Sequence, residues 1–262
     1  MKIRTETLKS YKNRRPISCL TSYDSMTAKI FDEAGIDLIL VGDSAANTVL
    51  GKATTLPITI EEMISFGAAV GSVVTKALVV IDMPFGSYEV SPEEALKNSI
   101  AVMKRTGADA VKLEGGSNRV ETIKLLVENG IPVMGHLGFT PQSVNQMGGF
   151  KVQGRGPDSE QITEQAKELE QAGVFSIVLE MVPSKLASEI TDELTVPTIG
   201  IGAGNQTDGQ ILVWQDFAGL SERLPKFVKK YAELRSSLES ATADYIKEVQ
   251  SREFPSSDNS FD

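Results

Sequence analysis

The sequence is poor in the two residue types that bind most zinc and copper ions in proteins. Its 262 residues include one cysteine, Cys19, and one histidine, His136. A disulfide needs two thiols, so the chain cannot form one within itself. Metal sites built on several cysteines, or on two histidines of one chain, are excluded for the same reason. Any metal ion bound here must therefore rest mainly on oxygen ligands.

Long apolar runs and an excess of basic residues are also absent. The longest apolar runs, such as Ala77–Ile81, are far shorter than the about 20 residues that a transmembrane helix needs. The net charge is −9 at pH 7, which argues against nucleic-acid binding because phosphates require a basic surface. No apolar signal core follows the basic segment Met1–Pro16. We therefore expect a soluble, intracellular protein.

Short apolar segments rich in β-branched residues alternate with longer segments of helical character. Thr59 and Glu62 have the spacing of a capping box, and Ser91 precedes Pro92 at a first helical position. We expect helices at 25–34, from 60 to about 70, from 92 to about 106, at 119–129, at 159–172 with Asp158 as the cap, and within 224–249. The expected strands are Ile17–Thr21, Leu38–Val41, Leu78–Ile81, Ala110–Leu113, Pro132–Met134, Ser176–Leu179, Pro197–Ile201 and Ile211–Trp214.

Eight strands with helical connections predict an α/β protein with the (β/α)8 TIM-barrel fold. The length agrees, because barrels of about 250 residues form one domain. We expect one domain over residues 1–262, with C-terminal helices and a short polar tail. The alternative is a doubly wound open sheet, but no Gly-x-Gly-x-x-Gly turn follows the first strand to support a dinucleotide-binding version.

Ionisable side chains gather where the expected strands end. The carboxyl ends of barrel strands meet at one face, which is where barrel enzymes have their active sites. A single aspartate at such a position means little, because aspartate is common in turns and caps. Six residues at this position favour a functional site: Asp43, Asp82, Lys112, Glu114, His136 and Glu180.

Crowded carboxylates repel one another unless a proton or a cation lies between them. Asp43, Asp82 and Glu114 follow neighbouring strands and offer oxygen ligands. Mg²⁺ suits such a set, and Mn²⁺ or Co²⁺ could replace it. A metal held in this way could chelate an α-keto acid and stabilise its enolate. Lys112 has two interpretations, contact with a substrate oxygen or a salt bridge to one of the acids.

Two other features have ordinary structural explanations. Gly200–Gly204 lies where many barrels bind phosphate, but a tight turn with a close backbone approach explains it at least as well. Cys19 lies inside an expected strand, so we predict a buried and unreactive thiol.

Together these residues resemble the ketopantoate hydroxymethyltransferase family, whose barrels belong to the pyruvate/phosphoenolpyruvate superfamily. The resemblance covers nearly the whole chain, and its motifs are specific as a set although each is weak alone. They are Asp32–Asp37, Val41–Ser44, Thr55–Pro57, Asp82–Tyr88, Val111–Gly116, Gly135–Gly138, Thr140–Ser143, Gly149–Arg155, Leu179–Glu180, Ile199–Gly204 and Thr207–Gln210.

The resemblance implies transfer of a one-carbon unit from 5,10-methylenetetrahydrofolate to 3-methyl-2-oxobutanoate (α-ketoisovalerate). The product would be ketopantoate, on the route to pantothenate and coenzyme A. The resemblance implies that Asp43, Asp82 and Glu114 hold Mg²⁺, and that Asp43, Ser44, Asp82 and Lys112 contact the keto acid. It assigns Glu180 as the proton acceptor.

The resemblance also implies a cytoplasmic homo-oligomer, often a decamer in bacteria, without nucleic-acid or membrane partners. An apolar stripe at helical spacing near the C-terminus agrees with an oligomer, although the stripe could also pack on its own barrel. It consists of Leu234, Leu238, Ala241 and Tyr245.

The sequence departs from the family pattern at Ala45–Asn47, Lys52–Ala53 and Ser65–Phe66. These positions flank the expected mouth of the site, so they concern folate contacts and turnover more than the fold or the metal. Three alternatives remain: a folate-independent lyase of the same superfamily, a paralogue that binds a keto acid without turnover, and a phosphate-binding barrel. The lack of a thiol besides Cys19 counts against an isocitrate-lyase-like enzyme.

Overall fold

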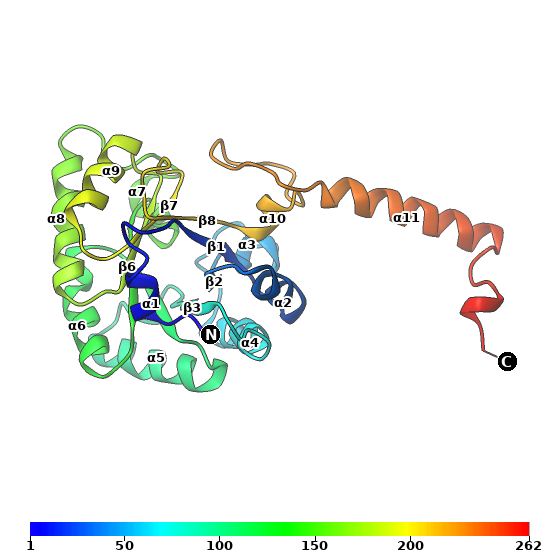
Figure 1. Ribbon diagram of the computed structural model, residues 1–262, viewed down its shortest axis with the longest axis horizontal. Coiled ribbons are helices and arrows are strands. Elements are labelled where there is room, and N and C mark those ends of the chain that lie inside the picture. Colours follow the sequence, from blue (N-terminus) through cyan, green and yellow to red (C-terminus); the bar gives the residue numbers. More distant parts are fainter. Residues whose placement is uncertain (262) are drawn as a thin grey trace. The chain divides into compact units, whose positions relative to one another are not determined.

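Eight parallel strands close into a barrel within residues 1–213 (Figure 1). The computed structural model describes residues 1–261, and a second compact unit begins at Trp214. Each strand pairs in parallel with both neighbours, and the last strand pairs with the first. The predicted TIM-barrel fold is therefore confirmed. The strands are β1 Ile17–Thr21, β2 Leu38–Val41, β3 Leu78–Asp82, β4 Ala110–Glu114, β5 Val133–Gly138, β6 Ser176–Glu180, β7 Thr198–Ile201 and β8 Gly209–Leu212.

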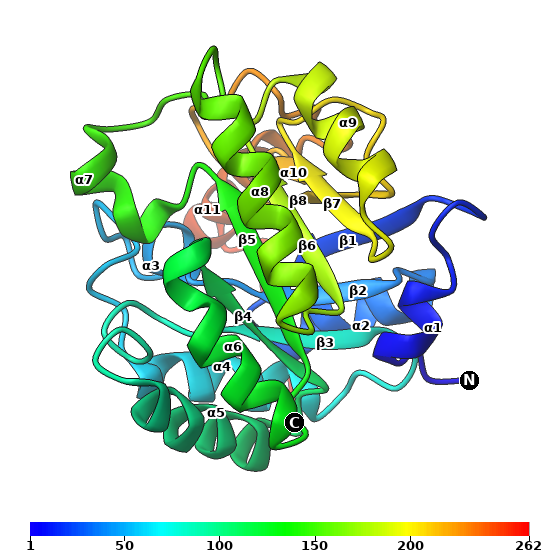
Figure 2. The ribbon, with the colours of Figure 1, turned by 90° about the vertical axis from the view of Figure 1, so that its left-hand side faces the viewer.

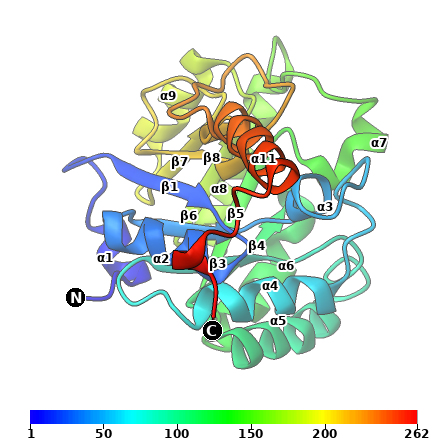
Figure 3. The same cartoon turned by 90° about the vertical axis from the view of Figure 1, so that its right-hand side faces the viewer.

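Helices surround these strands (Figure 2; Figure 3). Neighbouring helices pack in chain order, α2 on α4, α4 on α5, α5 on α6, α6 on α8 and α8 on α9. This arrangement buries the outer faces of the strands and leaves the loops at their two ends. The helices of the first unit are α1 Thr5–Lys9, α2 Ser25–Ala34, α3 Ala45–Thr48, α4 Ile60–Gly71, α5 Pro92–Thr106, α6 Val120–Glu128, α7 Val144–Met147, α8 Asp158–Gln171 and α9 Ser184–Glu193, with short 3₁₀ turns η1 Ser117–Arg119 and η2 Pro141–Ser143.

The two strongest helix starts are confirmed. The Thr59 hydroxyl accepts from the Glu62 N–H, and the Glu62 carboxylate accepts from the Thr59 N–H, so the capping box is complete. Ser91 accepts from the Glu94 N–H, with proline at the first helical position. Local sequence is sufficient to define these boundaries because each cap satisfies amides within one turn.

Some boundaries differ from the sequence-based expectation. Asp158 is the first residue of α8 rather than its cap, and Pro157 precedes it without a side-chain hydrogen bond to the helix end. Strand β8 ends at Leu212, so Trp214 begins α10 instead of ending a strand. Strands β3, β4 and β6 are one residue longer than expected and end on the acidic residues themselves.

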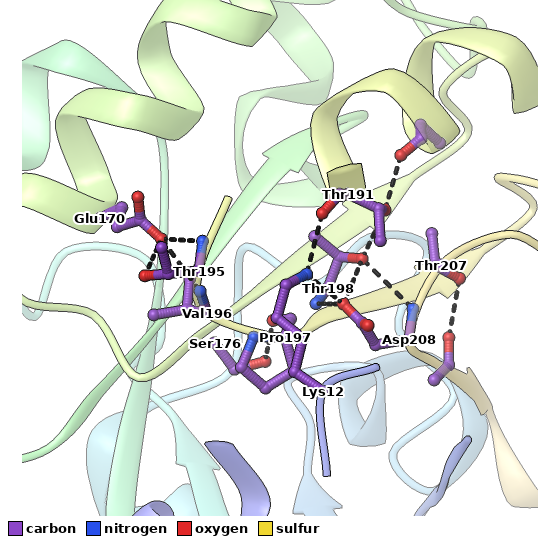
Figure 4. Close-up of polar contacts among 12 residues, drawn as sticks. Lys12, Glu170, Ser176, Thr191, Thr195, Val196, Pro197, Thr198, Thr207 and Asp208 are labelled. Carbon is purple, nitrogen blue, oxygen red and sulfur yellow. Dashed lines mark hydrogen bonds and ion pairs between the residues drawn. The ribbon is translucent and has the colours of Figure 1, made fainter. Parts of the chain in front are cut away.

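The amino-terminal end of the barrel is closed by the segment before β1. An aspartate precedes each of β2, β4 and β8, and each accepts a backbone N–H from the adjacent strand. Each aspartate also pairs with one basic residue of the N-terminal segment. The pairs are Arg15 with Asp37, Lys2 with Asp109, and Lys12 with Asp208. Figure 4 shows the last of these, where Lys12 also donates to the Thr191 carbonyl.

The interior of the barrel is apolar beneath the site. Buried side chains from the strands, including Cys19, Met134 and Ile199, form one cluster with Leu8 of α1. Cys19 thus has the buried position expected from the sequence.

The second unit contains α10 Trp214–Phe217, α11 Leu234–Ser251 and η3 Ser257–Asn259. Residues 224–233, which we expected to be helical, form no helix. Pro225 has no N–H and disfavours helical geometry in the residue before it, which explains the difference. No residue of α11 is buried. Within residues 1–261, no helix has both the length and the apolar character needed to span a bilayer.

Candidate active site

The parallel register brings the predicted site residues together. Asp82 at the end of β3 is paired with Lys112 of β4, and Glu114 of β4 is paired with His136 of β5. Glu180 ends β6, next to β5. Asp43 follows β2 directly, and its N–H donates to Asp82 Oδ2 at 3.0 Å. All six residues expected at strand ends therefore lie at the carboxyl-terminal end of the barrel, although His136 lies within β5 rather than after it.

The first part of the site is a cluster of three carboxylates around one ammonium group. Lys112 Nζ forms an ion pair with Asp82 Oδ1 and lies 3.8 Å from Glu114 Oε1. The salt-bridge interpretation of Lys112 is thus observed. The backbone approaches closely here, because a Cβ at Gly42 would lie 2.8 Å from Ser44 Oγ and 3.4 Å from Asp82 Oδ2. Only glycine fits at this position without moving the site.

Burial and mutual repulsion change the proton affinities of these acids. Burial, followed by the charges of Asp82 and Glu114, raises the pKa of Asp43 to about 8. Burial also raises the pKa of Glu114 to about 7, although the Lys112 charge opposes the shift. For Lys112, the neighbouring carboxylates outweigh burial and raise its pKa. The lysine is therefore charged at neutral pH, and it does not fully compensate the three acids.

The second part of the site is Glu180, on the other side of His136. His136 Nδ1 lies 3.4 Å from Glu114 Oε1, and its Nε2 lies 3.4 Å from Glu180 Oε2. Burial lowers the pKa of His136 and raises that of Glu180. The imidazole is therefore neutral near pH 7, and it separates Glu180 from the carboxylate cluster. A carboxyl group with a raised pKa is suited to accepting a proton.

The carboxylate cluster has the chemistry of a site for a hard divalent cation. Its donors are oxygen atoms, and Asp82 Oδ1 is buried without a hydrogen bond although it faces Lys112. Within residues 1–261, no three His, Cys, Asp or Glu side chains already surround a common point as a metal shell. Mg²⁺ needs only one or two carboxylates, with water and substrate completing its coordination, so the residues fit this ion. The assignment of Asp43, Asp82 and Glu114 as ligands stays a prediction.

Three polar residues of the site were not singled out from the sequence. Gln142, in the turn after β5, bonds to both Asp43 and Glu114. Tyr88, in the loop after β3, bonds to Gln142. The Tyr23 hydroxyl, after β1, lies 2.7 Å from Ser44 Oγ. All three follow strands at the same end of the barrel, and that position was the signal by which they could have been found.

The glycine segment after β7 has a structural role. A Cβ at Gly204, whose φ is +82°, would lie 2.5 Å from Ser184 Cβ at the start of α9. The close approach of loop and helix explains the glycine, as the sequence suggested.

Comparison with solved structures finds enzymes with the same barrel fold. Phosphonopyruvate hydrolase, crystallised with oxalate and Mg²⁺, superposes with a TM-score of 0.63 over 99% of this chain and 93% of its own, at 10% identity. The 2,3-dimethylmalate lyase of the PEP mutase/isocitrate lyase superfamily gives 0.61 over 100% and 89%, at 15% identity. At these identities the likeness establishes the fold alone.

Sequence comparison is more specific. The 3-methyl-2-oxobutanoate hydroxymethyltransferase of Corynebacterium glutamicum is 53% identical over 262 residues, covering 99% of this chain and 97% of its own. The enzyme of the same name from Leifsonia xyli is 55% identical over 243 residues, covering 92% and 88%. The family model for ketopantoate hydroxymethyltransferase matches residues 2–257. The chain is thus an enzyme, and it belongs to the ketopantoate hydroxymethyltransferase family.

Proposed function

We propose that this enzyme transfers a hydroxymethyl group from 5,10-methylenetetrahydrofolate to 3-methyl-2-oxobutanoate, giving ketopantoate for pantothenate and coenzyme A synthesis. The names of its relatives support the substrate and the product. The observation that carries the proposal is the division of the site by His136. A carboxylate cluster suited to a metal and a keto acid lies on one side, and one isolated base, Glu180, lies on the other.

The keto acid would bind at the carboxylate cluster. Its carboxylate is an anion, and Lys112 is the buried cation next to Asp82 and Glu114. Ser44 offers a hydroxyl held by Tyr23. Mg²⁺ held by Asp43, Asp82 and Glu114 would supply a Lewis acid that stabilises negative charge on the keto oxygen. Mn²⁺ or Co²⁺ is expected to serve in the same position.

Glu180 would remove the proton from C3 of the keto acid. Burial raises its pKa, which strengthens it as a base, and the neutral His136 lies beside it, with Nε2 3.4 Å from Glu180 Oε2. The Glu180 backbone carbonyl accepts from the Phe139 N–H at 2.8 Å, which holds the end of β6 to the segment after β5. The electron pair left at C3 forms the new carbon–carbon bond to the folate methylene carbon. Both bonds from that carbon to the folate nitrogens break, and water supplies the hydroxyl group in their place. The remaining proton of water and the proton taken from C3 end on the two nitrogens of the tetrahydrofolate that leaves.

A direct assay tests the proposal. The protein is incubated with 3-methyl-2-oxobutanoate, Mg²⁺ and 5,10-methylenetetrahydrofolate, and ketopantoate is measured by mass spectrometry. Omission of any one component should abolish the product. Cleavage of a keto-acid substrate without folate would instead support a lyase. Binding of the keto acid without any product would support a paralogue that has lost turnover.

We also propose a cytoplasmic homo-oligomer. The support is the family resemblance and the apolar stripe of α11, in which Leu238 and Tyr245 are exposed. Light scattering at micromolar concentration should give a mass several times 28.3 kDa. The mass of a single chain would contradict this proposal.

A further inference from the structure

We propose that Gln142 is a positioning residue that fixes the Asp43 and Glu114 carboxylates for Mg²⁺ and the keto acid. The inference rests on the proposed function. Gln142 lies in η2, directly after β5, and its side chain is buried at the site. It contacts the loops and strands that carry two of the three expected metal ligands.

The contacts of Gln142 reach three other segments of the chain. Its side-chain Nε2 donates to Asp43 Oδ2 at 3.1 Å and to the Met83 carbonyl at 3.1 Å. Its backbone N–H donates to Glu114 Oε2 at 3.0 Å. The Tyr88 hydroxyl donates to its Oε1. One residue thus holds the loop after β2, the loop after β3 and the end of β4 in a single network.

The network leaves no choice in the orientation of the Gln142 amide. The Met83 carbonyl can only accept, so the atom that faces it must be the nitrogen. The same nitrogen faces Asp43, while the oxygen faces the Tyr88 hydroxyl. Asp43 Oδ2 therefore receives an N–H, and the carboxylate cannot rotate without losing this bond.

The charge of the residue matters as much as its shape. An amide donor stabilises an ionised carboxylate and leaves its negative charge in place for a cation. A second lysine at this position would neutralise that charge and compete with the metal. Gln142 is therefore suited to orienting Asp43 and Glu114 without reducing their attraction for Mg²⁺. Partners that orient ligands in this way typically affect metal affinity by about 10- to 100-fold.

The test compares Mg²⁺ affinity in three single variants. Gln142→Met keeps the length of the side chain and removes its donors and acceptor. Tyr88→Phe leaves the carboxylate contacts but frees the amide oxygen. Gln146→Ala changes the same residue type on the exposed surface of α7, one helical turn away. Isothermal titration calorimetry with Mg²⁺ alone, and then with 3-methyl-2-oxobutanoate added, gives both affinities.

We expect Gln142→Met to weaken Mg²⁺ binding by about 10-fold or more and to raise KM for the keto acid. Tyr88→Phe should show a smaller loss in the same direction, and Gln146→Ala should bind as the unchanged protein does. If Gln142→Met does not fold, the Mg²⁺ affinity of Tyr88→Phe is the test: a reduced affinity supports the role of Gln142, and an unchanged affinity overturns it. Folded Gln142→Met with Mg²⁺ affinity within twofold of the unchanged protein would overturn the role of Gln142 and leave the proposed function intact. Failure of the unchanged protein to bind Mg²⁺ would overturn both.

Discussion

Acidic side chains lie at both ends of the barrel, but their surroundings are opposite. At the amino-terminal end, Asp37 pairs with Arg15 and accepts from the Ser18 N–H. Burial alone would raise the pKa of Asp37, yet these bonds lower it. Asp32 behaves in the same way, because backbone N–H groups of residues 75–77 outweigh its burial. At the carboxyl-terminal end, burial and repulsion raise the pKa values of Asp43, Glu114 and Glu180.

The difference lies in how the charges are compensated. The aspartates before β2, β4 and β8 each have a basic partner and a backbone donor. Among residues 1–261, the three carboxylates of the cluster share Lys112 alone as a nearby ammonium group. Ionised carboxylates therefore stabilise the fold at one end, whereas at the other they oppose it until a cation binds. Identical residue types thus have a structural role at one end and, in the proposed function, a catalytic or metal-binding role at the other.

The largest effect is expected for Asp82→Asn at the carboxyl-terminal end. This change keeps the volume but removes one negative charge and a ligand oxygen. Mg²⁺ and keto-acid binding should weaken together, and kcat/KM should fall by about 1,000-fold, or about 4 kcal/mol of transition-state stabilisation. Calorimetry and steady-state rates measure both quantities. Unchanged keto-acid affinity in the presence of Mg²⁺ would count against this site.

Glu180→Gln should separate the two parts of the site. The variant keeps the shape of the side chain but cannot accept a proton. It should bind Mg²⁺ and 3-methyl-2-oxobutanoate normally and lose exchange of the C3 proton with D₂O by about 100-fold or more. Proton NMR follows this exchange without folate. Exchange at the unchanged rate would show that the base lies elsewhere.

Asp37→Asn, at the amino-terminal end of the barrel, should lower the stability of the fold and leave metal binding unchanged. It weakens the bonds to Arg15 and Ser18, and should cost about 2 kcal/mol of folding free energy. The melting temperature should fall while Mg²⁺ affinity is unchanged. Asp244→Asn, on exposed α11, is the matched control and should change neither. A lower Mg²⁺ affinity in Asp37→Asn would mean that the two ends are not independent.

The smallest expected effect is a gain in stability for metal-free Asp43→Asn. A carboxyl with a raised pKa binds its proton more tightly in the folded state, so its contribution to stability is present below about pH 4 and is lost as the pH rises through about 8. Asparagine does not lose a proton. The variant should therefore melt a few degrees above the unchanged protein at pH 8, with no such gain at pH 4. Calorimetric scans without Mg²⁺ test this, and a lower melting temperature at pH 8 would contradict it.

Much of the barrel could be predicted from the sequence because its signals are local. Helices α2 and α5 have the expected bounds, with Asp24 and Ser91 as caps and Gly35 and Gly107 in left-handed conformations at their ends. Helix α9 was missed because Pro183 precedes it and no side chain caps it. Its only sequence signal is the spacing of the buried residues Leu186, Ala187 and Ile190.

The site could be predicted only as a set of residues at strand ends. The alternation of strands and helices along the sequence was sufficient to assign Asp82, Glu114 and Glu180 to one end of the barrel. No knowledge of their contacts was needed. The role of Gln142 depends on atoms 28 and 99 residues away in the chain, which no local pattern encodes. The same is true of the pairing between the N-terminal segment and the aspartates that precede strands, such as Lys12 with Asp208.

The buried thiol of Cys19 has a practical consequence for studying how this barrel opens. Cys19 lies in β1, which joins both β2 and β8, so it sits where the first and last strands of the ring meet. Burial raises its pKa, so the closed protein offers a thiol reagent neither access nor thiolate. A thiol reagent can then label only those molecules in which β1 has separated from its neighbouring strands. The labelling rate therefore reports the free energy of that opening. Since the chain has no other cysteine, the natural sequence already carries a single-site probe of barrel opening.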